Sequence, residues 1–258
     1  MSRTLCFVYG FACYVVCLFT FVYAIGFIGN VGVPVSMDSR PLGPTGVALA
    51  VDLGLLVLFA LQHSVMARPA FKRWWTQIVP PAAERSTYVL FSSLALALLF
   101  WQWRPLGGVV WDVEQPALRA LLYATFAAGW LTVLVTTFLI NHFDLFGLRQ
   151  VWLHLRGEPY RPLPFTTPGP YRYVRHPLYV GWFLAFWATP TMTVTHLVFA
   201  LATTAYILLA IRFEERDLVD VHGRAYADYR RRVPMLVPRL RAERATEAPV
   251  VTRHPERV

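Results

Sequence analysis

The chain has 258 residues, of which 56% are hydrophobic and only 15% are charged. A soluble domain usually carries about 25% charged residues, so this composition excludes an ordinary soluble fold and indicates a membrane protein. The formal net charge of +9 would suit a nucleic-acid partner, but the positive charge lies at the edges of apolar segments, which disfavours that partner.

The apolar residues form blocks of up to about twenty, the length that crosses a hydrocarbon core about 30 Å thick. The first block is too long for the core of a signal peptide, so we expect it to be retained. The fifth and sixth blocks are short and adjacent, which predicts a tight C-terminal helical hairpin. The six predicted spans are 5–28, 46–66, 88–103, 117–140, 178–191 and 194–211.

These spans predict an all-α, polytopic integral membrane protein with about six transmembrane helices. Residues 1–239 are expected to form a single membrane domain, with a cofactor-binding core over residues 165–238. The polar tail 240–258 is expected to be disordered. If the N-terminus lies inside, 21 of the 24 Lys and Arg residues fall in inner segments and three outside. The positive-inside rule therefore predicts that both termini are cytoplasmic.

The connections between the spans differ in character. Residues 31–45 are rich in Gly and Pro and read as an outer loop. Residues 67–87 are basic and aromatic, as expected at the inner headgroup layer. Residues 144–156 predict an interfacial amphipathic helix whose apolar side carries Leu145, Leu148, Trp152 and Leu155. The proline-rich stretch 157–170 predicts an extended, ordered loop.

Neither the cysteines nor the histidines have metal-binding spacing. Cys6, Cys13 and Cys17 share one face of the first helix and indicate packing. The seven histidines show none of the repeated HxxH patterns that bind iron in membrane desaturases, so we predict no metal.

Two polar clusters flank the last hairpin, in the stretches 169–182 and 211–238, and should meet on the cytoplasmic side. Charges at the mouth of a membrane helix are costly, so they usually mark a binding site. The stretches lack both common nucleotide-phosphate loops. Arginines, aromatic rings, His176 and the acidic pair Glu214-Glu215 suit a ligand with a cationic centre, a carboxylate and an adenine. S-adenosylmethionine has all these parts, although composition alone does not select it.

Three spaced elements carry a family resemblance: RHPLYVGW (175–182), the pair Glu214-Glu215, and HGRAYADYRRRVPMLVP (222–238). Together they resemble the isoprenylcysteine carboxyl methyltransferase superfamily of membrane enzymes. Further stretches are similar to one branch of it, the bacterial methanethiol S-methyltransferases. These are LQHSVMARPAFKRWW (61–75), ERSTYVL (84–90), LFWQWRP (99–105) and INHFDLFGLRQVWLHLRG (140–157).

The resemblance implies methyl transfer from S-adenosylmethionine to methanethiol, giving dimethyl sulfide and S-adenosylhomocysteine, in a bacterial inner membrane. It implies that the cofactor pocket is lined by Tyr171, His176, Pro177, Leu178 and Tyr179. One of Glu214 and Glu215 would hold the polar end of the cofactor. The family also places a substrate-side arginine before the acidic pair, and Arg212 is the nearest residue here.

The nucleophile of this reaction is a thiolate. Positive charge from Arg212, Arg175 or protonated His176 would favour it, so these three residues are the candidate catalytic groups. His63 and His142, at cytoplasmic helix ends, are weaker candidates for the substrate side. Structural roles remain open for all of these residues: helix capping, helix–helix hydrogen bonding or a solvated charge pair.

Two other functions remain open. One is a methyltransferase of the same superfamily that acts on a larger apolar acceptor, such as an isoprenylcysteine. The other is a non-catalytic membrane accessory protein of denitrification type, which the intact RHPxY and acidic pair disfavour.

Overall fold

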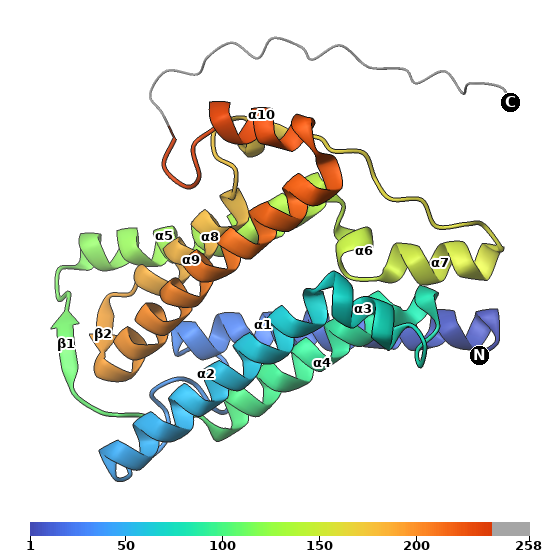
Figure 1. The fold of residues 1–258 in the computed structure, drawn as a ribbon. Coiled ribbons are helices and arrows are strands. Elements are labelled where there is room, and N and C mark those ends of the chain that lie inside the picture. Colours follow the sequence, from blue (N-terminus) through green and yellow to red (C-terminus); the bar gives the residue numbers. More distant parts are fainter. Residues whose placement is uncertain (239–258) are drawn as a thin grey trace, which may run out of the picture.

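The computed structural model describes residues 1–238, and the predicted disordered tail lies outside this part of the chain. The described residues are mostly helical (Figure 1). Five helices are long and apolar enough to cross a bilayer, which confirms the predicted helical membrane fold. They are α1 (Arg3–Gly29), α2 (Thr45–Ala67), α4 (Pro81–Gln102), α5 (Pro116–Ile140) and α9 (Val194–His222).

The predicted fifth span is the shorter apolar helix α8 (Pro177–Trp187), which has 11 residues. At 1.5 Å per residue it is about 16 Å long, roughly half of a hydrocarbon core. The chain then forms strand β2 (Thr191–Thr193), which pairs antiparallel with β1 (Val109–Asp112). The connection between α8 and α9 therefore contains a strand, paired with one from the connection between α4 and α5. The all-helical prediction did not include this β-ribbon.

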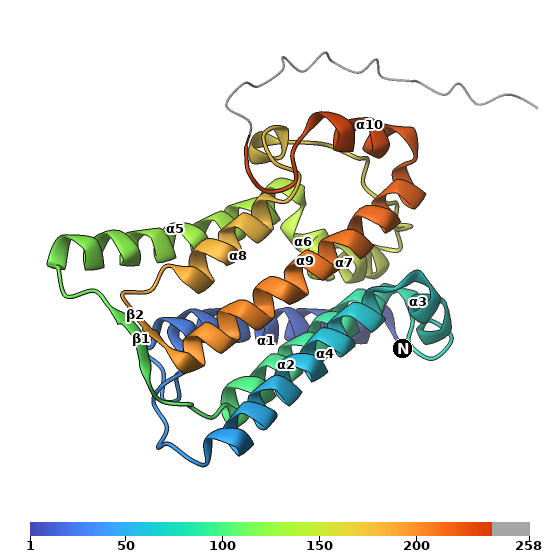
Figure 2. The ribbon, with the colours of Figure 1, turned by 60° about the vertical axis from the view of Figure 1, so that its left-hand side comes forward.

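The helices form two layers (Figures 1 and 2). One holds α1, α2 and α4, and the other holds α5, α8 and α9. Helices α5 and α8 cross at Gly129 and Gly181, where a Cβ on either glycine would lie 2.8 Å from the other's carbonyl oxygen. Small residues allow such close backbone contact between membrane helices. This crossing fixes the start of α8, which carries the RHP motif.

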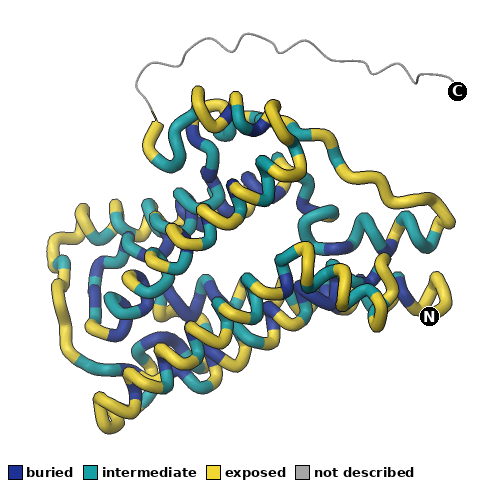
Figure 3. Tube along the Cα trace, in the orientation of Figure 1, coloured by how far each residue is buried: buried dark blue, intermediate teal, exposed yellow. Residues whose placement is uncertain are grey.

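Buried residues lie mainly toward the inside of the bundle, and exposed residues follow the outer faces of the helices (Figure 3). The core includes Phe27, Leu99, Trp103 and Ile211. Many exposed residues are also apolar, as expected for helix faces that contact lipid. The three cysteines are free thiols along α1, and two of them are buried, which agrees with a packing role.

Two helices extend beyond the predicted spans. Helix α4 begins at Pro81, and the predicted inner loop before it contains α3 (Pro69–Trp75). Helix α9 continues past Ile211 to His222 and ends at Gly223, whose φ of +57° favours glycine. Helix α10 (Arg224–Arg232) follows. As a result, the acidic pair lies on a continuous helix and not in a loop.

The predicted helix 144–156 is divided in two, α6 (His142–Leu145) and α7 (Leu148–Arg156). Gly147 separates them with a φ of +88°, and a Cβ there would lie 2.8 Å from the backbone nitrogen of Ser86. The most buried residue of α7 is Val151, which packs on α1, whereas Trp152 is 47% exposed. The amphipathic pattern was correct, but the face that docks on the protein is centred on Val151.

Candidate functional site

Three sequence motifs meet at the end of the bundle that carries α3, α7 and α10, which we call the basic end. The segment before α8, which includes the 3-10 turn η1 (Gly169–Arg172), lies beside the segment that follows α10. The backbone nitrogen of Arg175 donates to the Pro234 oxygen at 2.9 Å, and that of His176 donates to the Met235 oxygen at 3.2 Å. These bonds hold the RHP motif against the VP segment.

Arg175 joins α8, α9 and α10. Its Nε donates to Glu215 Oε1 at 2.6 Å, and its Nη1 donates to the Val233 oxygen at 2.6 Å and the Arg230 oxygen at 3.0 Å. Both partners of the ion pair are only 12% exposed. A buried pair of this kind needs further hydrogen bonds to be stable, and here the two carbonyls accept from Nη1. These bonds connect three elements of the site through Arg175, whose catalytic role remains a prediction.

The two glutamates differ in what they can still bind. Glu215 Oε1 accepts from Arg175 and, at 3.0 Å, from His176 Nε2. The Glu214 side chain is 44% exposed; its Oε2 accepts from the Tyr179 hydroxyl at 2.8 Å and lies 3.9 Å from His176 Nδ1. A carboxylate can accept about four hydrogen bonds. Glu214, which accepts one bond and is half-exposed, therefore retains more capacity for a ligand than Glu215, whose Oε1 already accepts two bonds within the protein.

An aromatic cluster lies next to the acidic pair. The Tyr229 hydroxyl donates to the Tyr171 carbonyl at 2.6 Å, and Phe165 packs on Tyr226 and Tyr229. Within residues 1–238, the buried hydroxyls of Tyr171 and Tyr226 have no hydrogen-bond partner. Burial raises the pKa of both phenols, so they remain protonated donors at neutral pH. Buried polar groups normally have partners, so these two hydroxyls are available to a bound molecule.

The other predicted residues near the motif lie at its edges. Pro177 is the buried first residue of α8, and Leu178 is partly exposed. Arg212 is exposed on the other side of Glu215, where it lines a surface pocket of about 340 Å³ with Glu215, Arg216 and Arg230. The structure thus brings together Tyr171, Arg175, His176, Tyr179 and the two glutamates, and it leaves Arg212 at the surface.

The two weaker histidine candidates bond to other elements. His63, on α2, lies within hydrogen-bond distance of Tyr88 and Ser92 on α4. His142, on α6, is 2.9 Å from the Tyr14 hydroxyl and 2.8 Å from Thr137 Oγ1. Both remain predictions for the substrate side.

Sequence reasoning missed several partners of the site. It singled out Tyr179 and Glu214 separately but gave no sign that they bond to each other. The carbonyls of Arg230 and Val233 carry no side-chain signal at all. Tyr88, Ser92 and Tyr206 looked like ordinary polar residues of apolar spans, and because Tyr88 and Ser92 lie 25 and 29 residues from His63 in the chain, no local signal connects them to it.

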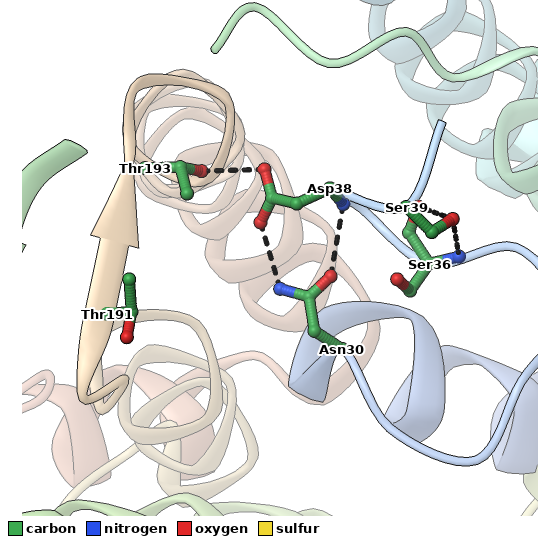
Figure 4. Close-up of a pocket in the computed structure, with 6 residues that line it drawn as sticks. All are labelled: Asn30, Ser36, Asp38, Ser39, Thr191 and Thr193. Atoms are coloured by element: carbon green, nitrogen blue, oxygen red, sulfur yellow. Dashed lines mark hydrogen bonds between the residues drawn. The ribbon is translucent and has the colours of Figure 1, made fainter. Parts of the chain in front are cut away.

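A second polar cluster lies at the opposite end of the bundle, beside the β-ribbon (Figure 4). The Asp38 carboxylate accepts from Thr193 Oγ1 at 2.8 Å and from Asn30 Nδ2 at 2.9 Å. The Asp38 backbone nitrogen donates to Asn30 Oδ1 at 3.0 Å. With Ser36, Ser39 and Thr191 these residues line a pocket of about 330 Å³. Their bonds join the loop after α1 to β2.

Comparison with known proteins identifies the class to which this fold and site belong. Residues 126–220 match the isoprenylcysteine carboxyl methyltransferase (ICMT) family, a stretch that includes the RHP motif and the acidic pair. The protein is a membrane methyltransferase. No solved structure matches the chain.

Relatives that match most of the chain identify the group more closely. A methanethiol S-methyltransferase of Crocosphaera subtropica is 60% identical over 238 residues, which are 92% of this chain and 93% of the relative. One of Mycobacterium tuberculosis is 57% identical, over 92% of this chain and 98% of the relative. Methanethiol S-methyltransferase 2 of Bradyrhizobium diazoefficiens is 54% identical, over 95% of each. The chain belongs to the isoprenylcysteine carboxyl methyltransferase family, in the group formed by these proteins, which confirms the predicted resemblance.

Proposed function

We propose that this protein transfers a methyl group from S-adenosylmethionine to the sulfur of methanethiol, giving dimethyl sulfide and S-adenosylhomocysteine. The observation that carries the proposal is the identity of 54–60%, over more than nine-tenths of the chain, to proteins named for the methanethiol reaction. The polar cluster at the basic end supplies a chemically suitable place for the methyl donor.

The residues of this cluster fit the polar parts of S-adenosylmethionine. Glu214 retains acceptor capacity for an ammonium group or for ribose hydroxyls. The hydroxyls of Tyr171 and Tyr226 are buried donors that lack partners within residues 1–238. Pro177, Leu178 and Tyr179 would form the adjoining wall, and aromatic faces attract a sulfonium. When bound, the donor supplies an activated methyl group on a positively charged sulfur.

Arg175 and His176 act on this site through Glu215. Both donate to that carboxylate, and they thereby fix the beginning of α8 against α9. This bonding holds Tyr179 where its hydroxyl orients Glu214. We infer that the pair positions the donor pocket, and that Arg212, exposed on the outer side of Glu215, adds positive charge at the rim of the site.

The reaction needs a thiolate, positioning and exclusion of water. A simple alkyl thiol has a pKa at or above that of cysteine, about 8.5, so little of it is ionised at neutral pH. Once the thiolate forms, direct displacement needs no covalent help from the protein.

We propose that the basic end is cytoplasmic, where the donor is available, and that the membrane is the bacterial inner membrane.

Purified protein in detergent or nanodiscs should produce dimethyl sulfide, measured by headspace gas chromatography, from methanethiol and S-adenosylmethionine. One methylene changes discrimination by only about 1–3 kcal/mol, so ethanethiol should react more slowly but not be refused. Farnesylcysteine should not react. A higher kcat/KM for farnesylcysteine than for methanethiol would contradict methanethiol as the acceptor. Failure to bind S-adenosylmethionine would contradict the proposed methyltransferase reaction.

The donor site has its own test in Glu214→Gln. Loss of one charge-assisted hydrogen bond costs about 1.5–3 kcal/mol, so titration calorimetry should show roughly ten- to a hundredfold weaker binding of S-adenosylmethionine. Glu158→Gln, which removes an exposed carboxylate paired with Arg156, is the matched control and should bind as the wild type does. Equal affinity of Glu214→Gln and wild type would remove Glu214 from the donor pocket.

A further inference from the structure

His63 lies on the inward face of α2. Asp52 and Leu56 are buried on this helix, and the His63 ring stacks on Phe59 with a centroid distance of 5.3 Å. Positions 52, 56, 59 and 63 follow the spacing of a single helix face. A titratable side chain therefore continues the buried stripe at the basic end of α2, where an apolar residue would be expected.

Two buried hydroxyls on α4 contact the His63 imidazole. The Tyr88 hydroxyl lies 2.9 Å from Nε2 and 3.0 Å from Nδ1, and Ser92 Oγ lies 3.2 Å from Nδ1. Tyr88 and Ser92 are 6% and 8% exposed. Tyr88 satisfies one nitrogen well at a time, and Ser92 can serve only Nδ1. Within residues 1–238 Tyr88 is the one hydrogen-bonding neighbour of Nε2, so pairing of Tyr88 with Nδ1 would free Nε2 to accept a proton from a bound molecule.

This cluster is connected to the helix that carries the acidic pair. Ser64, the neighbour of His63, hydrogen-bonds to the Tyr206 hydroxyl on α9 at 3.1 Å. Glu214 is eight residues further along the same helix, about 12 Å at 1.5 Å per residue. Tyr88 and Tyr206 are both neighbours of the Tyr179 side chain, and Tyr179 bonds to Glu214. The cluster and the proposed donor pocket therefore face the same region between the two layers.

His142 offers no comparable opening. Its Nε2 lies 2.9 Å from the Tyr14 hydroxyl and its Nδ1 lies 2.8 Å from Thr137 Oγ1, so a different hydroxyl serves each nitrogen. Its ring stacks on Phe138 at 4.2 Å, and the residue is 7% exposed. These contacts join α1 to the end of α5. Of the two histidines, His63 alone has a ring nitrogen that its neighbours can release.

We propose that His63, Tyr88 and Ser92 form the acceptor site, and that His63 takes the proton of the bound alkyl thiol; this rests on the proposed function. The S–H bond breaks, the proton moves to the imidazole and the electron pair stays on sulfur. The thiolate sulfur forms a bond to the methyl carbon of the sulfonium donor, whose own sulfur keeps the pair of the broken C–S bond. Dimethyl sulfide leaves, and the imidazolium returns its proton to water.

The surroundings of His63 suit this step. The Arg85 guanidinium lies 4.8 Å from the centroid of the Tyr88 ring on α4, Tyr206 faces the cluster from α9, and Arg68 lies beyond it, paired with Asp217 at 3.0 Å. The Arg85 charge favours a thiolate, but together with burial it also disfavours an imidazolium on His63, and the Arg68 charge is offset by Asp217. Because the imidazolium and the thiolate form side by side, the proton transfer creates a pair of opposite charges and not an isolated buried charge.

The test compares kcat/KM for methanethiol across pH in His63→Gln, Tyr88→Phe and the wild type. General-base catalysis contributes about 10²–10⁴-fold, so His63→Gln should lose that much near neutral pH. The loss should shrink as the pH approaches the pKa of the thiol, at or above about 8.5, because the solvent then ionises the substrate. Tyr88→Phe, which lacks one oxygen and keeps its shape, should lose about three- to tenfold with the same pH trend.

Tyr9→Phe is the matched control. Its hydroxyl bonds to Thr87, the residue before Tyr88, at 2.9 Å from the α1 side, and its loss should leave the pH profile unchanged. S-adenosylmethionine should bind all four proteins equally by calorimetry. Unchanged activity in Tyr88→Phe and His63→Gln, or a loss that is equal at every pH, would overturn the acceptor site while the proposed function stands. A wild type that forms no dimethyl sulfide would overturn both.

Discussion

The two ends of the helix bundle each carry a polar cluster built around carboxylates, and the clusters differ in what their groups can still bind. At the end beside the β-ribbon, Asp38 accepts from Thr193 and Asn30, and Asn30 also accepts from the Asp38 backbone (Figure 4). At the basic end, Glu215 Oε1 already accepts from Arg175 and from His176 and the side chain is only 12% exposed, whereas Glu214 next to it accepts one bond from Tyr179 and is half-exposed.

The comparison shows that a polar pocket by itself does not indicate a ligand site. Both ends have pockets of similar volume, about 330 and 340 Å³. In the Asp38 cluster the carboxylate, the Asn30 amide and the Thr193 hydroxyl hydrogen-bond to one another. The cluster therefore holds the loop after α1 against β2. The basic end retains two buried tyrosine hydroxyls that lack partners within residues 1–238. Unused hydrogen-bonding capacity distinguishes a binding site from a structural cluster.

The largest effect is expected from Arg175→Met. Removing one partner of a buried ion pair costs about 3–5 kcal/mol because the other charge remains buried, and here two carbonyls also lose their donor. Thermal unfolding in detergent should show this loss, together with loss of S-adenosylmethionine binding. Arg231→Met, at an exposed pair with Asp228, should change neither. Lost activity with an unchanged unfolding temperature would instead make Arg175 a catalytic residue.

An intermediate effect is expected from the tyrosines. Tyr171→Phe and Tyr226→Phe remove buried hydroxyls that have no partner in the described part of the chain, so the unliganded protein should become more stable by about 1 kcal/mol. The same variants should bind S-adenosylmethionine roughly three- to tenfold more weakly. Tyr229→Phe is the contrast, because it loses the bond to the Tyr171 carbonyl and should lower stability. If Tyr171→Phe destabilises the protein and leaves the affinity unchanged, its hydroxyl serves the fold.

The smallest effect is expected at the opposite end. Asp38→Asn weakens two hydrogen bonds of a partly exposed carboxylate, so stability should fall by about 0.5–1.5 kcal/mol. The affinity for S-adenosylmethionine and kcat should remain those of the wild type, measured by calorimetry and headspace assay. A weaker affinity in this variant would show that the two ends are coupled, and it would contradict the conclusion that the Asp38 cluster is only structural.

The sequence by itself determined the helical membrane fold, most span positions and the family. The lengths of apolar segments are local properties, and a bilayer about 30 Å thick translates them directly into helices. The motifs RHPLYVGW and Glu214-Glu215 likewise identify the family without any coordinates. The division of the predicted helix at Gly147, by contrast, accompanies the close approach of Ser86 from α4, and no pattern in the segment predicted that contact.

Only the tertiary structure decided which polar group serves which purpose. Arg175 was predicted as a catalytic candidate, yet its guanidinium is occupied by Glu215 and by carbonyls more than fifty residues away in the chain. Glu214 and Glu215 are neighbours in sequence, but on a continuous helix they point about 100° apart, so Glu215 is buried against Arg175 and His176 while Glu214 stays half-exposed. His63 and His142 looked equivalent until their partners were known. Hydrogen-bond partners are set by packing between elements distant in sequence, and composition or spacing within one segment does not encode that information.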